Sequence, residues 1–421
     1  MPGTRLRATR LTRIPLAGGG QETLLSEVGS QYLLPLFSTA DACALRLVCR
    51  EFLAAVSEQP WEDGETVIRG SIARWRACFP RARRANVRQQ HSGGAAVVRS
   101  AAVVDAECVH FQGLQELNMR GCTSITDAAF AHLRGIHKLD MSGCSQDGIT
   151  DAAFAHLRSI HTLSMSRCGQ DGITDAAFAH LSGIHTLDMS RCSQAGITDA
   201  AFAHLSGIHT LNMDCCRNIT DAAFVHLRGI RKLDMGNCPH ITDAAFVHRH
   251  GIQWLNMIAC CITDEAFVHL RGIKWLNAGV SMWGITDDAI AHLIGIHTLS
   301  LFACENVTDE ALAHLGGIHT LSISECEGIT GAGFVHLAGI HALYMSFCSG
   351  ATGADLCAGL ECLAGIHTLD MSHCSQAEVT GKAFARQAGI QRLDMTGCDP
   401  ACIQAAQESG LAVHIEEEEE E

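Results

Sequence analysis

The sequence predicts an α/β solenoid, with parallel strands on a concave face and short helices outside, preceded by a small all-α segment near the N-terminus. The first observation behind this prediction is a unit of 21 to 26 residues that recurs between residues 114 and 415. The second is that most copies join an alternating apolar pattern to a short helical pattern. The third is that residues 24–62 do not follow the repeat.

A leucine at the centre of each unit marks thirteen copies. Internal repeats with a period of roughly 20 to 50 residues are typical of solenoids, in which each copy contacts only its neighbours. The thirteen leucines are Leu117, Leu139, Leu163, Leu187, Leu211, Leu233, Leu255, Leu276, Leu299, Leu321, Leu343, Leu369 and Leu393.

One copy shows why the unit predicts a strand followed by a helix. Residues 139–141 alternate apolar and polar side chains, as a strand with one buried face does. Thr150 suits a helix N-cap, and Asp151 places a negative charge in the first helical turn. Phe154 and Leu157 then lie three residues apart on one helical face. Because one strand and one short helix cannot bury that face alone, stacked copies must share a core.

A cysteine follows the central leucine by five residues in twelve of the copies, and Ser281 takes its place in the other one. This order of strand, cysteine, loop, Ile-Thr-Asp and helix resembles the cysteine-containing subclass of leucine-rich repeats. The resemblance covers about three-quarters of the chain and implies strands on the concave face. The cysteines are Cys122, Cys144, Cys168, Cys192, Cys216, Cys238, Cys260, Cys304, Cys326, Cys348, Cys374 and Cys398.

The recurring cysteines are interpreted as small buried turn residues, because stacking predicts one equivalent cysteine in each repeat whereas a zinc site needs converging ligands. Histidines form two similar columns, one in the helices (such as His132 and His156) and one before the strands (such as His137 and His161). Metal binding or redox sensing is the alternative for these columns. Because no nucleophile–base pair or phosphate loop stands out, we expect no enzyme, no metal and no cofactor.

The charge of the chain favours a protein partner. The formal net charge of -15 argues against nucleic acid and anionic membranes as partners. No segment is long and apolar enough to cross a membrane, and the Arg-rich N-terminus predicts a disordered leader, with a transit peptide as the alternative. We therefore expect a cytoplasmic or nuclear protein, in a host cell if the chain is viral, whose 21 cysteines stay reduced.

Residues 24–62 predict a small helical element, because apolar residues 45, 48, 49 and 52 have helical spacing. By itself such an element could be the cap that covers the end of a repeat array. The segment also resembles an F-box: Glu27-Val28, then Asp41 at the start of the next helix, then residues 45–52 (Leu-Arg-Leu-Val-Cys-Arg-Glu-Phe) and finally Trp61 follow F-box order.

The F-box resemblance implies docking onto a Skp-type adaptor of a cullin ubiquitin ligase, with the repeats capturing the substrate protein. The chain would then be the non-catalytic substrate-recognition adaptor of that ligase, and a stand-alone protein-binding scaffold is the alternative. By the same resemblance, the residues that supply or support the apolar docking surface are Leu25, Val28, Leu33, Leu36, Leu47, Val48, Cys49 and Phe52.

The copies differ most at strand positions that should face the concave surface. Trp254 and Trp275 precede the central leucine in adjacent copies, where six of the thirteen copies have threonine. Because neighbouring strands lie about 5 Å apart, we expect the two indoles to lie side by side. Exposed aromatic residues are typical of binding hot spots; drift in a duplicated array, or mutual packing of the two indoles, is the alternative. The predicted partner-binding residues are Trp254, Ile258, Trp275, Met282, Trp283, Phe302, Tyr344 and Phe347.

These predictions divide the chain into five parts and give a protein that is monomeric by itself. The parts are a disordered basic leader (residues 1–22), an F-box-like helical segment (23–62), a linker with a degenerate first repeat (63–113), a leucine-rich-repeat array (114–415) and an acidic tail (416–421).

Overall fold

The computed structural model describes residues 38–45, 55–68, 70–89, 103–248, 251–280, 284–351, 353–374, 379, 381–384, 387 and 389–415. The chain falls into two compact units, Met1–Ile197 and Thr198–Glu421. The predicted leader and tail, the eight predicted F-box docking residues, and Met282 and Trp283 lie outside the described residues.

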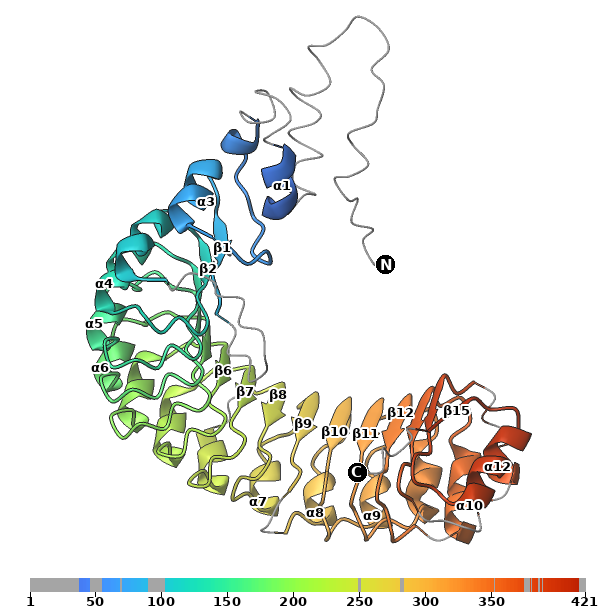
Figure 1. Cartoon of the computed structure of the whole chain (residues 1–421). Coiled ribbons are helices and arrows are strands. Elements are labelled where there is room, and N and C mark those ends of the chain that lie inside the picture. Colours follow the sequence, from blue (N-terminus) through green and yellow to red (C-terminus); the bar gives the residue numbers. More distant parts are fainter. Residues whose placement is uncertain are drawn as a thin grey trace, which may run out of the picture. The chain divides into compact units, whose positions relative to one another are not determined.

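In the first unit, short parallel strands pair in the order of the sequence (Figure 1). The strands are β1 (Arg84–Asn86), β2 (Glu116–Asn118), β3 (Lys138–Asp140), β4 (Thr162–Ser164) and β5 (Thr186–Asp188). The helices, of which those labelled η are 3-10 helices, are α1 (Thr39–Leu45), α3 (Ile72–Cys78), η4 (Asp105–Phe111), α4 (Asp127–Phe130), η5 (Ala131–Leu133), α5 (Asp151–Phe154) and α6 (Asp175–Phe178).

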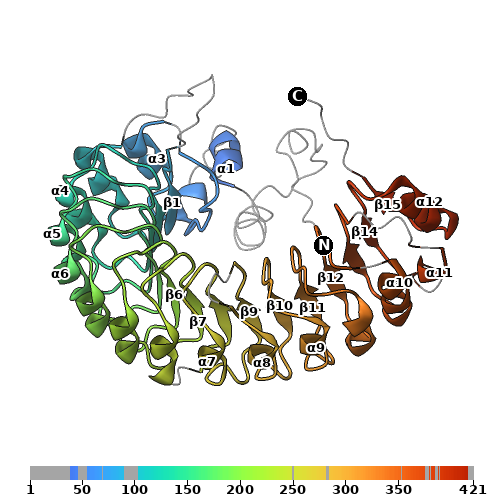
Figure 2. The same cartoon turned by 90° about the horizontal axis from the view of Figure 1, so that it is seen from below.

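The second unit repeats this arrangement from β6 to β15. Figures 1 and 2 both show its helices on the outer side of its strands. The strands are β6 (Thr210–Asn212), β7 (Lys232–Asp234), β8 (Trp254–Asn256), β9 (Trp275–Asn277), β10 (Thr298–Ser300), β11 (Thr320–Ser322), β12 (Ala342–Tyr344), β13 (Thr368–Asp370), β14 (Arg392–Asp394) and β15 (Val413–His414). The helices are η6 (Asp199–His204), η7 (Asp221–His226), η8 (Asp243–His248), α7 (Asp264–Phe267), α8 (Asp287–Ile290), α9 (Asp309–Leu312), η9 (Ala332–Leu337), α10 (Gly353–Cys362), α11 (Gly381–Phe384) and α12 (Pro400–Glu408).

The predicted repeat is confirmed by the register of the strands. Leu117 pairs with Leu139 in the first unit, and Leu255 pairs with Leu276 in the second, so the central leucines stack in columns. Their side chains are buried, as are the residues two positions later, which are methionine in most copies, and the helix residues Phe154 and Leu157. Two strands were not predicted, β1 and β15, because Ala85 and Val413 stand where the other strands have leucine.

Most helices of the repeats begin as the sequence predicts, with a threonine cap and an aspartate that also binds the next repeat. The Thr150 hydroxyl accepts a hydrogen bond from the Ala152 N–H at 3.3 Å and so caps α5. The Thr150 N–H and hydroxyl in turn donate to the two carboxylate oxygens of Asp127, in the preceding repeat, each at 2.7 Å. We call this two-bond contact the Asp–Thr clasp. It recurs at Asp105–Thr126, Asp151–Thr174, Asp199–Thr220, Asp221–Thr242, Asp243–Thr263, Asp264–Thr286 and Asp287–Thr308.

In the described part of the predicted F-box segment, Asp41 and Trp61 have defined partners. Asp41 lies in the first turn of α1, where its carboxylate accepts a hydrogen bond from the Ser38 hydroxyl at 2.8 Å. The Trp61 indole is buried, donates to the Val56 carbonyl at 2.7 Å and packs edge-on against Phe79. In the described part of the chain, no helix combines the length and apolar character that crossing a membrane requires.

Candidate partner-binding site

Trp254 and Trp275 form a stacked pair on the strand side of the second unit. They occupy equivalent positions at the start of β8 and β9, which are paired in register. Their ring centroids are 4.2 Å apart and their planes differ by 7°. Both side chains are half-buried. The structure therefore confirms the predicted side-by-side placement, and the mutual packing that was the alternative is also present.

A lysine extends this stack into a third strand. Lys232 opens β7 and pairs in register with Trp254. Its Nζ lies 4.5 Å from the centroid of the Trp254 ring, a distance at which a cation is attracted to the face of an indole. Since Lys232 and Trp275 come from opposite sides of β8, both faces of the Trp254 ring are covered, and only its edge faces a partner.

The strand face around this stack carries positive charge. Arg231 and Lys274 each lie directly before a strand residue of the stack, and both are exposed. Arg231, Lys232 and Lys274 form no ion pair with a described carboxylate. Asp234 lies on the same face at the end of β7, where its carboxylate accepts a hydrogen bond from the Asn256 amide at 3.0 Å. The sequence did contain a signal for this surface, because two of only four lysines in the chain flank the tryptophans.

Ile258 and Phe302 follow β8 and β10 and lie half-buried on the same side of the sheet. Each lies close to a glycine of a neighbouring strand turn. A Cβ added to Gly236 would lie 3.0 Å from Cγ2 of Ile258, and one added to Gly279 would lie 2.8 Å from the Phe302 carbonyl oxygen. The two glycines therefore leave the space that the two bulky side chains use. On this face of β8, the polar Asn256 lies between Trp254 and Ile258.

Tyr344 and Phe347 are exposed, with 36% and 51% of their surface accessible. They belong to β12 and the turn after it, where Phe347 stacks on His373 with centroids 4.3 Å apart. Strand β11, which carries Thr320 and Ser322, separates them from β10. The predicted partner-binding residues in the described part of the chain therefore form two groups rather than one.

The cysteine column occupies buried turns. The Cys144 thiol donates to the Met119 carbonyl of the preceding repeat at 3.3 Å, and Cys238 donates likewise to Met213 at 3.2 Å. Burial raises the pKa of the Cys144 thiol to about 12, so it remains protonated at neutral pH. Within the described ranges, no three His, Cys, Asp or Glu side chains gather as a metal site would require. The geometry matches the interpretation of these cysteines as turn residues.

The histidines before the strands stack along the sheet. In the second unit the His297 and His319 rings are 4.5 Å apart, His319 and His341 are 4.5 Å apart, and His341 and His367 are 4.2 Å apart. Burial and the neighbouring rings His297, His341 and His367 lower the pKa of His319 below its ordinary value. This column begins beside Lys274, one strand beyond the tryptophan stack.

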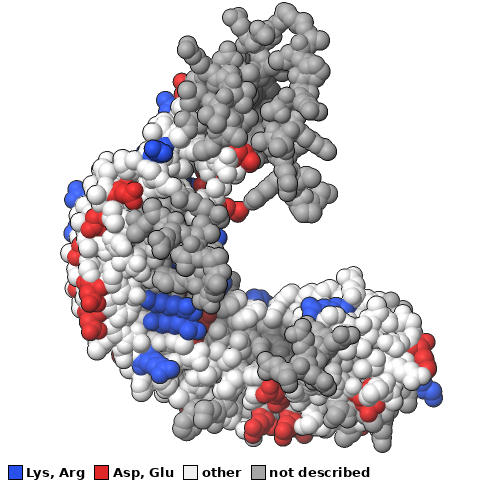
Figure 3. All heavy atoms as spheres, viewed as in Figure 1, with Lys and Arg blue, Asp and Glu red and all other residues white. Residues whose placement is uncertain are grey.

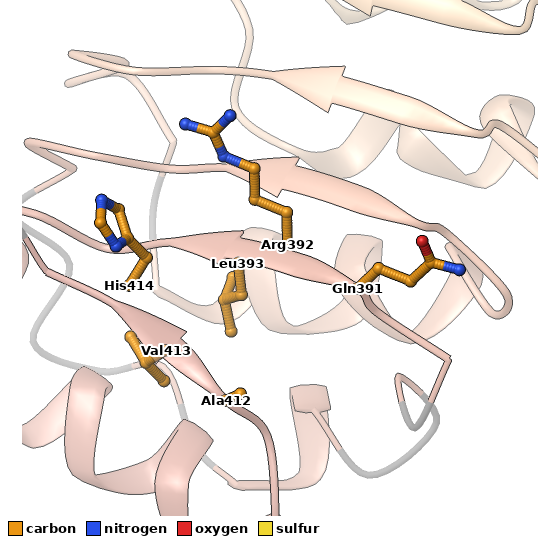
Figure 4. Close-up of a pocket in the computed structure, with 6 residues that line it drawn as sticks. All are labelled: Gln391, Arg392, Leu393, Ala412, Val413 and His414. Carbon is orange, nitrogen blue, oxygen red and sulfur yellow. The ribbon is translucent and has the colours of Figure 1, made fainter. Parts of the chain in front are cut away.

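An open cavity of about 470 Å³ lies at the last strands, between β14 and β15 (Figure 4). Its lining includes Arg392 and His414, whose side chains point out of the sheet in Figure 4, and the apolar Leu393 and Val413. The Arg392 guanidinium lies 3.9 Å from the Asp394 carboxylate. The lining contains no nucleophile beside a base, so the cavity does not suggest catalysis.

No family model matches the chain, and no curated protein matches it. Among solved structures, the chain is similar to TLR13 in a complex with the single-stranded RNA ssRNA13, with a TM-score of 0.54, 15% identity, and coverage of 85% of this chain. It spans about half of that TLR13 chain, 52%. It is also similar to an internalin (inlF) from Listeria monocytogenes, with a TM-score of 0.57, 16% identity, and coverage of 77% of this chain and 92% of the internalin.

At these identities the two similarities concern the fold. They agree with the registered columns of leucines, the parallel strands and the short outer helices described above. The chain therefore has the α/β fold of a leucine-rich-repeat solenoid.

Proposed function

We propose that the chain is a non-catalytic adaptor that captures a partner protein on the strand face of residues 198–421. The stacked, half-buried indoles of Trp254 and Trp275 carry this proposal. Threonine occupies the equivalent position in β4, β5, β6, β10, β11 and β13, so the fold does not require tryptophan there. Large aromatic side chains on an accessible face are typical of binding hot spots. Although the similar TLR13 chain was solved with RNA, the net charge of -15 favours a protein partner here.

We further propose that residues 23–62 join this adaptor to a Skp–cullin–F-box ubiquitin ligase in the cytoplasm or nucleus, and that the array belongs to the cysteine-containing subclass of leucine-rich repeats. The order of Glu27-Val28, Asp41, residues 45–52 and Trp61 supports the first of these. The cysteine in twelve copies supports the second. The partner bound by the repeats would then be the substrate that the ligase modifies.

Affinity purification of the tagged full-length chain, followed by mass spectrometry, tests both halves of the proposal. We expect a Skp-type adaptor to co-purify with the wild type and to be lost from a Val48→Asp, Phe52→Asp variant. A second set of proteins should be lost from a Trp254→Thr, Trp275→Thr variant, which introduces the residue found in most other copies. Unchanged circular dichroism is the control for folding in both variants. Absence of any Skp-type adaptor from the wild-type sample would contradict the ligase assignment.

A stand-alone scaffold, in which the N-terminal residues only cover the first repeat, is a second candidate. One observation favours it: the Arg83 N–H donates to the Trp61 carbonyl, and the Ile68 N–H donates to the Asn86 carbonyl, each at 2.8 Å. These bonds attach residues 61–68 to the chain around β1. This candidate predicts that deletion of residues 24–62 lowers the midpoint of urea unfolding and leaves partner capture intact. The ligase proposal predicts that the same deletion removes the Skp-type adaptor from the purified sample.

A further inference from the structure

We propose that the surface formed by Arg231, Lys232, Trp254, Lys274 and Trp275, which we call the indole–lysine patch, binds an acidic segment of the partner protein. This inference rests on the proposed capture of a protein by the strand face and specifies the chemistry of the segment that is bound. Its basis is the combination of edge-exposed indoles with cations that form no ion pair with a described carboxylate, on one side of three paired strands. The Lys274 Nζ donates one hydrogen bond, to the Gly295 carbonyl at 3.3 Å.

The exposed parts of the two indoles favour an anion. An aromatic ring has a negative face and a positive edge, and both faces of the Trp254 ring are covered by Lys232 and Trp275. No described residue accepts a hydrogen bond from Nε1 of either indole, and neither atom is a buried atom without a partner. Both N–H groups therefore reach solvent, where a carboxylate can accept their hydrogen bonds.

The cations of the patch favour the same ligand. Arg231 and Lys274 are exposed, Lys232 lies over an indole, and the three form no ion pair with a described carboxylate. Asp234 and Asp214 are nearby acids on this face. The Asn256 amide and the Gly236 N–H donate to the Asp234 carboxylate, and the Asn237 amide donates to the Asp214 carboxylate. A carboxylate of a partner would therefore meet positive charge and hydrogen-bond donors that are available to it.

This patch contrasts with the rest of its unit. Residues 198–421 contain 10 Lys and Arg against 27 Asp and Glu, a formal charge of -17. Acidic residues such as Asp287, Asp288 and Glu310 lie in the first turns of α8 and α9, and Figure 3 shows acidic side chains gathered on the helical side near α8. Screening limits the repulsion between exposed charges to about 8 Å at physiological salt, so the local cations decide what binds on the strand side.

A nucleic acid fits this patch less well than an acidic peptide. Bases bind such sites by stacking on aromatic faces, and the Trp254 faces are occupied. The face of the Trp275 ring that points away from Trp254 lies on the side of Thr298, its register partner in β10.

The inference is tested by the fluorescence anisotropy of a labelled peptide of alternating glutamate and leucine, titrated with the full-length protein. A labelled peptide of alternating glutamine and leucine is the matched control ligand. We expect the glutamate peptide to bind, and its affinity to fall about tenfold between 50 and 300 mM NaCl. An Arg231→Gln, Lys232→Gln, Lys274→Gln variant should lose about tenfold in affinity. Lys382→Gln changes an exposed lysine of α11 on the helical side and should leave the affinity unchanged.

Equal binding of the glutamine peptide, or an unchanged affinity of the triple variant, would overturn the inference. Tighter binding of a single-stranded RNA of matched length would do so as well. These failures differ from failure of the proposed function. If the partner found by mass spectrometry is lost from the Trp254→Thr, Trp275→Thr variant but retained by the triple variant at all salt concentrations, protein capture by this face stands and the acidic ligand is wrong. If both variants retain that partner, both proposals fail.

Discussion

The residue four positions after each central leucine has a left-handed backbone. It is glycine at Gly121, Gly143 and Gly397, but a residue with a side chain in most other copies, such as Arg167 (φ 61°) and Ala303 (φ 55°). This conformation directs the Ala303 N–H to the Ser324 carbonyl of the next repeat and lets Cys304 turn back into the core. A side chain there costs about 1 kcal/mol or more relative to glycine, and the hydrogen bonds between repeats maintain the conformation.

Ala303→Gly should therefore stabilise the protein. We expect the free energy of unfolding to rise by about 0.5 to 1 kcal/mol, because glycine relieves the left-handed strain but also makes the unfolded chain more flexible. Urea denaturation followed by circular dichroism measures the change. Ala313→Gly is the matched control: Ala313 is exposed and has a helical backbone after α9, so the same substitution there should destabilise. A loss of stability in Ala303→Gly would show that no strain is present.

The cysteines form two classes, and only one of them should react with alkylating reagents. Burial raises the pKa of Cys144, Cys326 and Cys374 to about 12, so almost no thiolate exists at pH 8. Among the cysteines whose side chains the structure describes, those that are partly exposed are Cys78, Cys215, Cys261, Cys357 and Cys362.

With iodoacetamide at pH 8, peptide mass spectrometry should find rapid modification of the partly exposed cysteines. The buried column should be modified only after urea is added, because alkylation requires an accessible thiolate. Equal rates for Cys261 and Cys238 in the native protein would contradict the buried turn geometry described above.

At the scale of the element, the Asp–Thr clasp explains how helices of four residues persist. An isolated helix of this length is unstable in water. In the structure, Asp287 begins α8 and accepts hydrogen bonds from the Thr308 N–H at 2.8 Å and the Thr308 hydroxyl at 2.6 Å. The Thr308 hydroxyl then accepts from the Glu310 N–H and caps α9. The start of each helix that has this clasp is thus fixed by the repeat before it.

Asp287→Ala should lower the free energy of unfolding by about 2 kcal/mol, because two charge-assisted hydrogen bonds between repeats are lost and the Thr308 N–H loses its acceptor. Asp288→Ala is the control from the neighbouring position. Asp288 is exposed, and alanine occupies its position in α4, α5 and α6. We expect the control to change stability by less than about 0.5 kcal/mol in urea titrations. Similar losses in both variants would refute the clasp.

At the scale of the whole molecule, a column of stacked histidines crosses several repeats and makes the stability of the protein depend on pH. The His297, His319, His341 and His367 rings stack along four strands. Burial and the surrounding rings lower the pKa of His319, whereas the unfolded chain has the ordinary histidine pKa of about 6.5. The unfolded state therefore binds the proton more strongly. The contribution to stability is complete above the unfolded pKa and decreases as the pH falls through it toward the folded pKa.

His319→Gln should make the free energy of unfolding less dependent on pH between 7.5 and 5.5. Urea titrations of the variant and of the wild type at both pH values measure this difference. The wild type is the reference because the acidic chain, with a net charge of -15, also changes in stability as its carboxylates titrate in both proteins. His314→Gln is the control, since His314 is an exposed histidine just after α9 and not one of these stacked rings. An unchanged pH dependence in His319→Gln would exclude a role for the column.

The repeat, its register and the helix starts could be predicted from the sequence because they depend on local patterns copied many times. Central leucines such as Leu139, caps such as Thr150 and turn cysteines such as Cys144 each have one buried or bonded environment wherever the unit occurs. Strands β1 and β15 could not be predicted in this way. Their pairing depends on the neighbouring strand, while their own residues lack the leucine.

The tertiary structure alone decided which side chains meet across repeats. The sequence placed Trp254 and Trp275 in adjacent strands, but strand register brought Lys232 over the Trp254 indole and so covered both faces of that ring. It also separated Tyr344 and Phe347 from that stack and gave Asp287 a partner in the next repeat. Local periodicity fixes what each residue does within its own unit, whereas contacts between residues more than twenty positions apart depend on how the units stack.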